Sequence, residues 1–455
     1  MKNIPAIGII LAAGKGTRIK SETPKVLHPV WGIPSVLRVC NAVRKGLGCK
    51  KIIVVVGKKA EEVIGLLNKK SKDIIFVYQK VQKGTGHAVK TAINSPVFKK
   101  FNGNVFVFPG DAGLIDEETV RNFKNKFEKS NCDLMMLTGK YEGEPENNPY
   151  GRVVREDNKV IGILQAKDIL NMSPEQKYGP FTRQQLLENN EFDSGMFAFK
   201  SIFLKKYIKK LKPKNVQKEL YITDLVEIYN REGLKVGAFQ YPNNDVLLGF
   251  NSRSDLKKME SILRKKCFEI LKDIITIEDE ENFYIDEEIV KDIVKMDKKG
   301  IPVDITLGEG CYISKGVQLS PGVKIGKNSV LDGNIFLGKK VNIHENVHIS
   351  TYPDQKLFIG DNTEIFGGNI IKGRVYIGKD TRIEAGVRIT GSDENPTVIG
   401  DNCIIKGTTY IFGSVIEKES KVQHCVLINQ HVKKGVIKYI LPESEGTNLL
   451  TQLRT

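Results

Sequence analysis

The chain has 455 residues, more than one hydrophobic core usually organises, so we expect two domains joined by a connector. No run approaches the roughly 18 uninterrupted apolar residues of a membrane-spanning helix, and the seven cysteines lack the spacing of zinc sites or disulfide frameworks, which favours the reducing cytoplasm. The net charge of +16 comes from scattered lysines, so we expect neither a nucleic acid nor a membrane as partner.

Up to about residue 253, short apolar runs alternate with amphipathic stretches. Buried strands are predicted at Ile7 to Leu11, Ile52 to Val56, Ile74 to Tyr78 and Val105 to Phe108. A helix between the first two is predicted by apolar residues at helical spacing: Val36, Val39, Cys40, Val43 and Leu47. This alternation predicts an α/β domain over residues 1–253, with a doubly wound, mostly parallel sheet and ligands at the C-terminal ends of its strands.

The segment from Leu11 to Pro29, LAAGKGTRIKSETPKVLHP, begins at the end of the first predicted strand. Gly14 and Gly16 let backbone N–H groups approach phosphoryl oxygens, and Arg18 and Lys25 supply positive charge for an incoming polyanion. The Walker spacing G-x-x-x-x-G-K-[ST] is absent from this segment. The loop therefore predicts a phosphate-binding site of another kind.

Further polar and small residues lie downstream of predicted strands. Gln79, Gly84 and Thr85 belong to the run QKVQKGTGHAV, which follows the third strand. Asp111 follows the fourth strand, where a carboxylate can hold Mg²⁺ bound to substrate phosphates, although a lone Asp after a strand is more often a turn residue. Asn251 lies much later in the chain, in LLGFNSRSDL.

Together these segments resemble those of the bacterial N-acetylglucosamine-1-phosphate uridyltransferases, within the sugar nucleotidyltransferase family. Gly151 in NPYGRVVRE and the sequence YITD at 221–224 extend the resemblance over residues 1–255. It implies that UTP and a sugar-1-phosphate form a UDP-sugar with Mg²⁺ as cofactor. It also implies catalytic roles for Arg18 and Lys25 and metal binding by Asp111 and Asn251. The nucleotide-binding residues that it implies are Leu11, Ala13, Gly14, Gln79, Gly84 and Thr85.

Two positions depart from the family's pattern at the sugar. Where the family has a Glu and an Asn, this sequence has Gln165 in GILQAKD and Asp193 in EFDSGMF. With Gly151, these are the sugar-binding residues that the resemblance implies. Position 165 thus has an amide in place of a carboxylate, and position 193 has a carboxylate in place of an amide. This changes which of the two side chains can donate hydrogen bonds to the sugar and which can only accept them. The sugar is therefore N-acetylglucosamine-1-phosphate or, as the first alternative, another sugar-1-phosphate, and a nucleotide other than UTP stays open.

Residues 254–300 differ from what precedes them. A charged helical stretch, DLKKMESILRKKCFEILKDI, leads into an acidic segment, EDEENFYIDEE. We interpret this region as a helical and acidic connector whose charges face solvent.

From residue 305 the hydrophobic period becomes six residues. The first row is Leu307, Ile313, Leu319, Ile325, Leu331, Leu337, Ile343 and Ile349. The second row is Ile359, Ile365, Ile371, Ile377, Ile383 and Ile389. The third row is Ile399, Ile405 and Ile411, followed after a one-residue slip by Ile416, Val422 and Ile428. This register predicts a parallel β-helix over residues 301–432, with loops at 350–356 and 391–397 and a C-terminal tail at 433–455.

A left-handed β-helix of hexapeptide repeats follows the catalytic domain in the family too, which implies assembly into a homotrimer through the β-helix. Bifunctional members also use it to acetylate glucosamine-1-phosphate with acetyl-coenzyme A. Their acetyltransferase motifs have no recognisable counterpart between Leu307 and Ile428. We therefore expect an assembly or regulatory solenoid and interpret its histidines as surface or stacking residues: His344, His348, His424 and His431.

Two further functions are compatible with the sequence. One is that of a bifunctional enzyme with a divergent acetyltransferase site. The second is that of a non-catalytic nucleotide-binding scaffold, of the kind found among some translation-factor subunits. Their catalytic loop is typically degraded, whereas here Arg18, Lys25, Asp111 and Asn251 all stand in motif context, which favours an enzyme.

Overall fold

The computed structural model describes residues 4–14, 16–70, 73–439 and 453–454, which form two compact units divided after Glu260. Most of the expected C-terminal tail, 440–452 and 455, lies outside the described residues. Within the described ranges, no helix has both the length and the apolar character needed to cross a bilayer.

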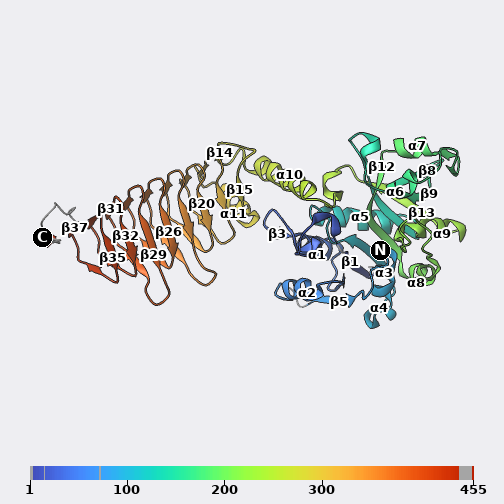
Figure 1. The fold of residues 1–455 in the computed structure, drawn as a ribbon, viewed down its shortest axis with the longest axis horizontal. Helices are drawn as coiled ribbons and strands as arrows, with labels where there is room; N and C mark the ends of the chain where they lie inside the picture. The colour runs from blue at the N-terminus through green and yellow to red at the C-terminus, as the bar shows by residue number, and fades with distance from the viewer. Residues whose placement is uncertain (1–3, 15, 71–72, 440–452, 455) are drawn as a thin grey trace. The chain divides into compact units, whose positions relative to one another are not determined.

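The first unit is built on a nine-stranded sheet whose main strand order is β13-β7-β12-β6-β1-β4-β5 (Figure 1). Along this path only β12 runs antiparallel to its neighbours β6 and β7. The antiparallel pair β8 and β9 extends the sheet from β12. The strands are β1 Ala6–Ala12, β4 Ile52–Val56, β5 Ile74–Tyr78, β6 Asn104–Pro109, β7 Leu134–Lys140, β8 Arg152–Glu156, β9 Lys159–Leu164, β12 Glu191–Lys200 and β13 Val236–Gln240.

Helices cover both faces of this sheet, because successive residues of a strand point to opposite sides. In β1, Ile10 joins one apolar core and Ile9 joins the other. The first face carries α1 Ser35–Leu47, α2 Ala60–Asn68 and α5 Glu117–Lys129. The second face carries α3 Thr85–Ile93, α4 Pro96–Lys99, α8 Ser201–Tyr207 and α9 Leu225–Arg231. The predicted strands, the helix with its buried stripe and the doubly wound, mostly parallel fold are confirmed.

A smaller apolar cluster joins the β8–β9 pair to two short helices, α6 Ala166–Leu170 and α7 Arg183–Glu188. Two short hairpins complete the unit. They are formed by β2 Pro29–Val30 with β3 Ile33–Pro34 and by β10 Lys177–Tyr178 with β11 Phe181–Thr182. Helix α10, Arg253–Leu271, follows the last loop of the sheet.

The second unit contains three parallel sheets that advance by one strand per coil, as expected for a left-handed β-helix (Figure 1). The first sheet contains β14 Thr276–Ile277, β16 Thr306–Leu307, β19 Lys324–Ile325, β22 Asn342–Ile343, β25 Glu364–Ile365, β28 Arg382–Ile383, β31 Ile404–Lys406, β34 Lys421–Gln423 and β37 Ile437–Tyr439, with β38 Leu453–Arg454 paired antiparallel to β37. The second contains β15 Tyr284–Ile285, β17 Tyr312–Ile313, β20 Val330–Asp332, β23 His348–Ser350, β26 Ile370–Gly373, β29 Arg388–Gly391, β32 Tyr410–Phe412 and β35 Val426–Ile428. The third contains β18 Gln318–Leu319, β21 Ile335–Leu337, β24 Leu357–Ile359, β27 Val375–Ile377, β30 Thr397–Ile399, β33 Val415–Ile416 and β36 His431–Val432.

The parallel sheets begin earlier than residue 301. Strands β14 and β15 lie in the expected connector, β14 just before its acidic segment and β15 within it, and they pair with β16 and β17. Helix α11, Glu287–Lys298, follows β15. Helix α11 interrupts the first coil, so its apolar residues do not recur every six residues. The hydrophobic period alone could therefore not predict that β14 and β15 belong to the β-helix.

The interior of the β-helix follows the predicted rows with one exception. Ile371, Ile383 and Ile411 are all fully buried. Near the C-terminal end, however, Leu427 is buried and Ile428 is 50% exposed, so the predicted inward position of Ile428 is wrong. The reason is a second slip in register: Ile411 pairs with Leu427, and His424 turns the preceding corner with a positive φ of 49°.

Candidate functional site

A cluster of charged and polar side chains lies where β1 and β6 end. Lys25 begins a 3₁₀ turn, Lys25–Leu27, and its ammonium nitrogen forms an ion pair with Oδ2 of Asp111, the second residue after β6. The same nitrogen donates a hydrogen bond to Oδ1 of Asn251 at 2.8 Å, and Nη2 of Arg18 donates to that oxygen at 2.7 Å. The fold therefore brings together both expected catalytic residues and both expected metal ligands.

Local packing determines where the Lys25 side chain lies. Gly16 has a φ of 59°, and a Cβ at this position would stand 2.7 Å from Cβ of Lys25, so the loop closes tightly only with glycine there. The Lys25 ammonium also lies 5.5 Å from the ring centre of Phe250. Only 13% of the Lys25 side chain is exposed, compared with 20% for Asp111. Partial burial strengthens this ion pair relative to one on an open surface.

Asp255 orients Asn251, a role that we did not expect from the sequence. Its Oδ2 accepts hydrogen bonds from the backbone N–H groups of Asn251 at 2.7 Å and Ser252 at 2.9 Å. In return, the Ser252 hydroxyl accepts from the backbone N–H of Asp255 at 3.1 Å. This reciprocal arrangement is a capping box at the start of α10. The spacing S-x-x-D at 252–255 was the signal that could have revealed it.

The segments expected to bind nucleotide meet beside the first loop. The backbone N–H of Gln79 donates to the carbonyl of Val56, and its side-chain nitrogen lies 2.8 Å from Nδ1 of His87. That nitrogen also donates to the Gly84 carbonyl at 3.4 Å. Gly84 precedes α3 with a φ of 95°, and the Thr85 hydroxyl accepts from the backbone N–H of Ile222 at 3.2 Å. Gln79 is thus held in place by its amide nitrogen, and its amide oxygen has no partner among the described residues.

Three expected nucleotide-binding positions lie at the end of β1. The carbonyl of Leu11 accepts a hydrogen bond from the backbone N–H of Gly110 at 3.0 Å, which ties the strand to the loop before Asp111. A Cβ at Gly57 would lie 2.8 Å from the carbonyl oxygen of Ala13, so two loops approach closely there. Around Gly14, by contrast, no heavy atom of the described residues lies within 4 Å of the position of a Cβ, its two chain neighbours set aside. This open backbone can admit a phosphate.

The three expected sugar-binding residues also converge. The backbone N–H of Asp193 donates to the carbonyl of Gly151 at 2.9 Å, and a Cβ on Gly151 would lie 2.9 Å from Nε2 of Gln165. A larger residue at 151 would therefore displace the amide of Gln165. Asp193 is 9% exposed, and burial raises its pKa to about 7. Its Oδ1 accepts a hydrogen bond from the backbone N–H of Gly195 at 3.0 Å, which acts in the opposite direction and lowers the pKa.

Arg152, the residue after Gly151, is 1% exposed. Its guanidinium binds backbone carbonyls instead of an acid: Nη1 donates to Asn148 at 2.8 Å and to Tyr150, and Nη2 donates to Pro145 at 3.0 Å. Burial lowers the pKa of Arg152 below its ordinary value. Its position in NPYGR gave no signal of this role, because an arginine in a polar segment usually faces solvent.

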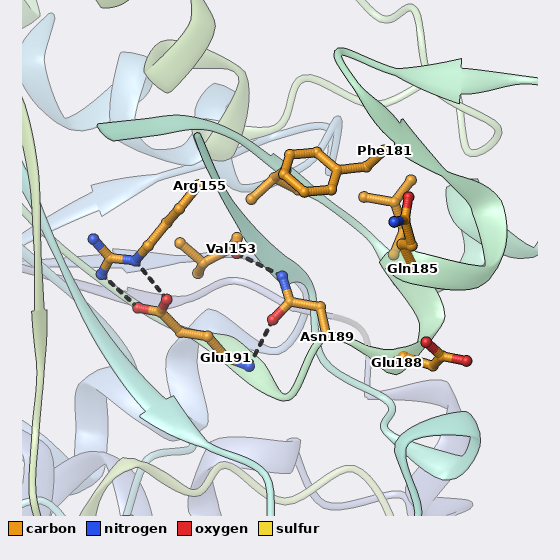
Figure 2. Close-up of a pocket in the computed structure, with 9 residues that line it drawn as sticks. Val153, Arg155, Phe181, Gln185, Glu188, Asn189 and Glu191 are labelled. Atoms are coloured by element: carbon orange, nitrogen blue, oxygen red, sulfur yellow. Dashed lines mark hydrogen bonds and ion pairs between the residues drawn. The ribbon is translucent and has the colours of Figure 1, made fainter. Parts of the chain in front are cut away.

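A surface pocket of about 370 Å³ lies on another part of the sheet, beside β8 and α7 (Figure 2). Its polar groups already bind one another: Arg155 forms a bidentate pair with Glu191 at 2.6 and 2.7 Å, and Asn189 donates to the Val153 carbonyl at 2.8 Å. None of the expected site residues lines this pocket. We therefore do not assign the candidate site to it.

Two of the four histidines in the β-helix pair with acidic residues. His344 stacks on Phe366 with ring centres 4.5 Å apart and lies 3.0 Å from a Glu364 oxygen. His431 lies 2.8 Å from a Glu417 oxygen. His348 and His424 belong to β23 and to the corner before β35, respectively.

Comparisons with known proteins identify relatives of this chain. Residues 8–159 match a family model described as a MobA-like NTP transferase domain. The chain is 33% identical over 382 residues to the "Bifunctional protein GlmU" of Clostridium kluyveri, with 78% of each chain covered. It is 38% identical over 286 residues to the protein of that name in Clostridium tetani, covering 62% of this chain and 58% of that one. A solved UDP-glucose pyrophosphorylase complexed with UDP-glucose has a TM-score of 0.43 and 16% identity, over 57% of this chain and 99% of that one.

Proposed function

Because the chain belongs to the GlmU family, we propose that it transfers uridylate from UTP to N-acetylglucosamine-1-phosphate and releases pyrophosphate. The observation that carries this proposal is the cluster of Arg18, Lys25, Asp111 and Asn251 at the carboxyl ends of the parallel strands. Two polyanions must meet in such a reaction, and this cluster supplies cations and hard oxygen ligands at one place. The chain is accordingly a nucleotidyltransferase.

The residues present fit a magnesium ion. Asp111 and Asn251 each offer an oxygen, and both oxygens already contact a cation, the ammonium group of Lys25. Proteins often hold Mg²⁺ by one or two such ligands together with substrate phosphates, so a third acidic residue is not required. When bound, Mg²⁺ would neutralise phosphate charge and stabilise the leaving pyrophosphate.

Arg18 and Lys25 would lower the repulsion between the two anionic substrates. In the proposed mechanism a phosphate oxygen of the sugar-1-phosphate attacks the α-phosphorus of UTP in line, and the bond to pyrophosphate breaks without a covalent enzyme intermediate. The open backbone around Gly14 would accept the phosphates, and the free amide oxygen of Gln79 would accept a hydrogen bond from the uracil N–H. The enzyme would act mainly by positioning its substrates.

For the sugar, we propose that Gly151, Gln165 and Asp193 make the contacts. Their convergence supports this assignment. The amide of Gln165 supplies donors, and the buried carboxyl of Asp193 supplies acceptors or, when protonated, one donor. Another sugar-1-phosphate remains the first alternative, because this pair differs from the family's pattern.

Bifunctionality is a second candidate because the relatives in both Clostridium species are named bifunctional. A divergent acetyltransferase site would release coenzyme A thiol from acetyl-coenzyme A in the presence of glucosamine-1-phosphate. We expect no such release, because the β-helix sequence carries no recognisable acetyltransferase motif. Thiol release above the enzyme-free background would contradict this expectation.

We also propose that the protein assembles into a homotrimer through its β-helix and acts in the cytoplasm. Rings on the third sheet support an assembly surface: the exposed Phe336 and Tyr376 flank the partly buried Phe358, and the three rings stack in consecutive coils with ring centres 4.9 and 5.0 Å apart. The cysteines are free thiols, which suits a reducing compartment. Sedimentation equilibrium tests the trimer, and a monomeric mass would contradict it.

Pyrophosphate release tests the main proposal. The assay contains purified protein, UTP, Mg²⁺ and a panel of sugar-1-phosphates that includes N-acetylglucosamine-1-phosphate. We expect that sugar to be turned over fastest. Binding of UTP with Mg²⁺, but no pyrophosphate release with any sugar phosphate, would favour the non-catalytic scaffold.

A further inference from the structure

Ser35, the first residue of α1, is fully buried between the two loops that carry Lys25 and Asp111. Its hydroxyl donates a hydrogen bond to the carbonyl of Gly110, the residue before Asp111, at 3.1 Å. Its backbone N–H donates to the carbonyl of His28, which follows the turn that begins at Lys25, also at 3.1 Å. One buried serine therefore connects the loop of a proposed catalytic cation to the loop of a proposed metal ligand.

The backbone of Gly110 is held on both sides. Its N–H donates to the carbonyl of Leu11 at 3.0 Å, and a Cβ at this position would lie 2.9 Å from the same oxygen. One hydrogen-bonding group of Gly110 is thus used by β1 and the other by Ser35. Because Asp111 follows directly, these two bonds determine the direction in which the chain enters the loop of the carboxylate.

Gly113 leaves the space that the Ser35 hydroxyl occupies. A Cβ at this glycine would lie 2.8 Å from Oγ of Ser35 and 3.1 Å from Cγ2 of Val30, so one of these neighbours would have to move. The φ of Gly113 is not positive, and its backbone conformation alone does not require glycine. The hydrogen bond from Ser35 to Gly110 therefore depends on a small residue two positions after Asp111.

We propose that Ser35 is a positioning residue, whose hydroxyl holds the loop of Asp111 where the carboxylate can share a metal ion with Asn251. This inference rests on the proposed function. The ammonium group of Lys25 also joins Asp111 to Asn251, but that connection would be lost when the ammonium binds a phosphate. The bond from Ser35 goes to a backbone carbonyl behind the site, so it would hold the loop throughout the reaction. Groups that support metal ligands in this way commonly change metal affinity or activity by 10- to 100-fold, on the order measured for other sites.

Mn²⁺ binding without nucleotide tests the assignment independently of turnover. Ser35→Ala removes the donor and leaves the buried carbonyl of Gly110 without it. We expect the dissociation constant for Mn²⁺, followed by the electron paramagnetic resonance signal of the free ion, to rise about tenfold. We expect the kcat for pyrophosphate release to fall by a similar factor. The KM for the sugar-1-phosphate should change less than about twofold, because the proposed sugar-binding residues lie on and beside β8, β9 and β12.

Ser329→Ala is the matched control. Ser329 is also fully buried, and its hydroxyl donates to a backbone carbonyl, that of His344, at 2.8 Å. The variant loses the same kind of hydrogen bond in the β-helix, so we expect wild-type Mn²⁺ affinity and wild-type kinetics.

Gly113→Ala should disturb the same hydrogen bond from the other side. The double variant with Ser35→Ala should then bind Mn²⁺ no more weakly than Ser35→Ala alone, because one bond can be lost only once. A loss equal to the product of the two single losses would show that the two positions act separately, and would contradict their shared role in holding Asp111.

The outcomes for Ser35 and for the proposed function can be told apart. If Ser35→Ala has the circular dichroism of the wild type and binds Mn²⁺ with wild-type affinity, Ser35 is not a positioning residue. If Ser35→Ala does not fold, Ser35→Cys, which keeps the shape and weakens the donor, takes its place in the same assay. If the wild type binds Mn²⁺ but releases no pyrophosphate with any sugar-1-phosphate, the proposed function fails and Mn²⁺ affinity alone decides the role of Ser35. Absence of Mn²⁺ binding to the wild type would overturn the inference together with the metal site.

Discussion

The ammonium nitrogen of Lys25 lies 2.8 Å from Oδ1 of Asn251 and simultaneously forms an ion pair with Asp111. One cation thus connects the two expected metal ligands. A positive group between these oxygens keeps the partly buried Asp111 carboxylate paired when no metal is bound. In the proposed mechanism, Lys25 would leave these two oxygens and bind a substrate phosphate.

Lys25→Met should therefore have two opposite effects. Turnover should fall by about 100-fold, the scale expected when one group that stabilises the transition state is removed. In the absence of nucleotide, Mn²⁺ should bind more tightly, because no ammonium group competes for Asp111 and Asn251. Pyrophosphate release measures the first effect, and the electron paramagnetic resonance signal of free Mn²⁺ measures the second. Lys315→Met, in an exposed pair with Glu288, is the control.

Asp111→Asn should abolish most turnover and leave the fold intact. The amide keeps the shape of the side chain but removes the charge that would hold the metal. We expect at least a 100-fold loss of pyrophosphate release, in line with about 3 kcal/mol for one lost electrostatic contact. Circular dichroism should match the wild type. Near-normal turnover would remove Asp111 from the proposed metal site.

The stability of the first unit should depend on Asp193. Its folded pKa of about 7 lies above the ordinary value of 3.8, so the folded state holds the proton more tightly than the unfolded chain. The free energy of unfolding should therefore fall as pH rises from about 4 to 7, by at most about 4 kcal/mol from this residue. Asp193→Asn should be more stable than the wild type at pH 8 and lose this advantage at pH 4. Urea denaturation at both pH values measures the difference, and a constant difference would contradict the buried, protonated carboxyl.

The exchange of Gln165→Glu together with Asp193→Asn tests sugar specificity. Both positions keep their size while the charge moves from one to the other, so the site should keep its shape and change its donors. We expect the ratio of kcat/KM between two sugar-1-phosphates to change by about tenfold, a scale set by one or two hydrogen bonds, with the KM for UTP unaffected. An unchanged ratio would show that these side chains do not contact the part of the sugar that differs.

The β-helix offers a matched pair of neighbouring isoleucines. Ile371 is fully buried and Ile370 is 37% exposed on the same strand. Ile371→Ala should lower the free energy of unfolding by about 3 kcal/mol through lost burial and a cavity, whereas Ile370→Ala should cost less than about 1 kcal/mol. Chemical denaturation measures both. Similar losses in the two variants would contradict the inward row that repeats every six residues.

Much of the architecture could be predicted because regular hydrophobic patterns determine which side chains are buried. The spacing through Ile371 and Ile383 predicts interior positions that the structure confirms. The same reasoning failed at Ile428, because a corner one residue shorter moves the inward position from residue 428 to residue 427. A hydrophobic run such as VLI at 426–428 does not show which of its members points inward.

The sequence could predict which residues belong to the site but not which of them contact one another. Arg18, Lys25, Asp111 and Asn251 stand out in sequence, yet their mutual contacts depend on where the loops close. The roles of Arg152 and Asp255 were missed, although the S-x-x-D spacing at 252–255 could have revealed Asp255. Arg152 in particular is buried and has no acidic partner among the residues that the structure describes, against the usual preference of arginine for the surface.

The decisive assay combines UTP, Mg²⁺ and N-acetylglucosamine-1-phosphate with the purified protein and follows the release of pyrophosphate. We expect release that requires all three components, stops on chelation of the metal and falls about 100-fold in Lys25→Met. Release with a different sugar-1-phosphate would keep the reaction and correct the sugar. Absence of release with every sugar-1-phosphate and nucleotide, from a folded protein that binds UTP, would contradict the assignment as a uridyltransferase.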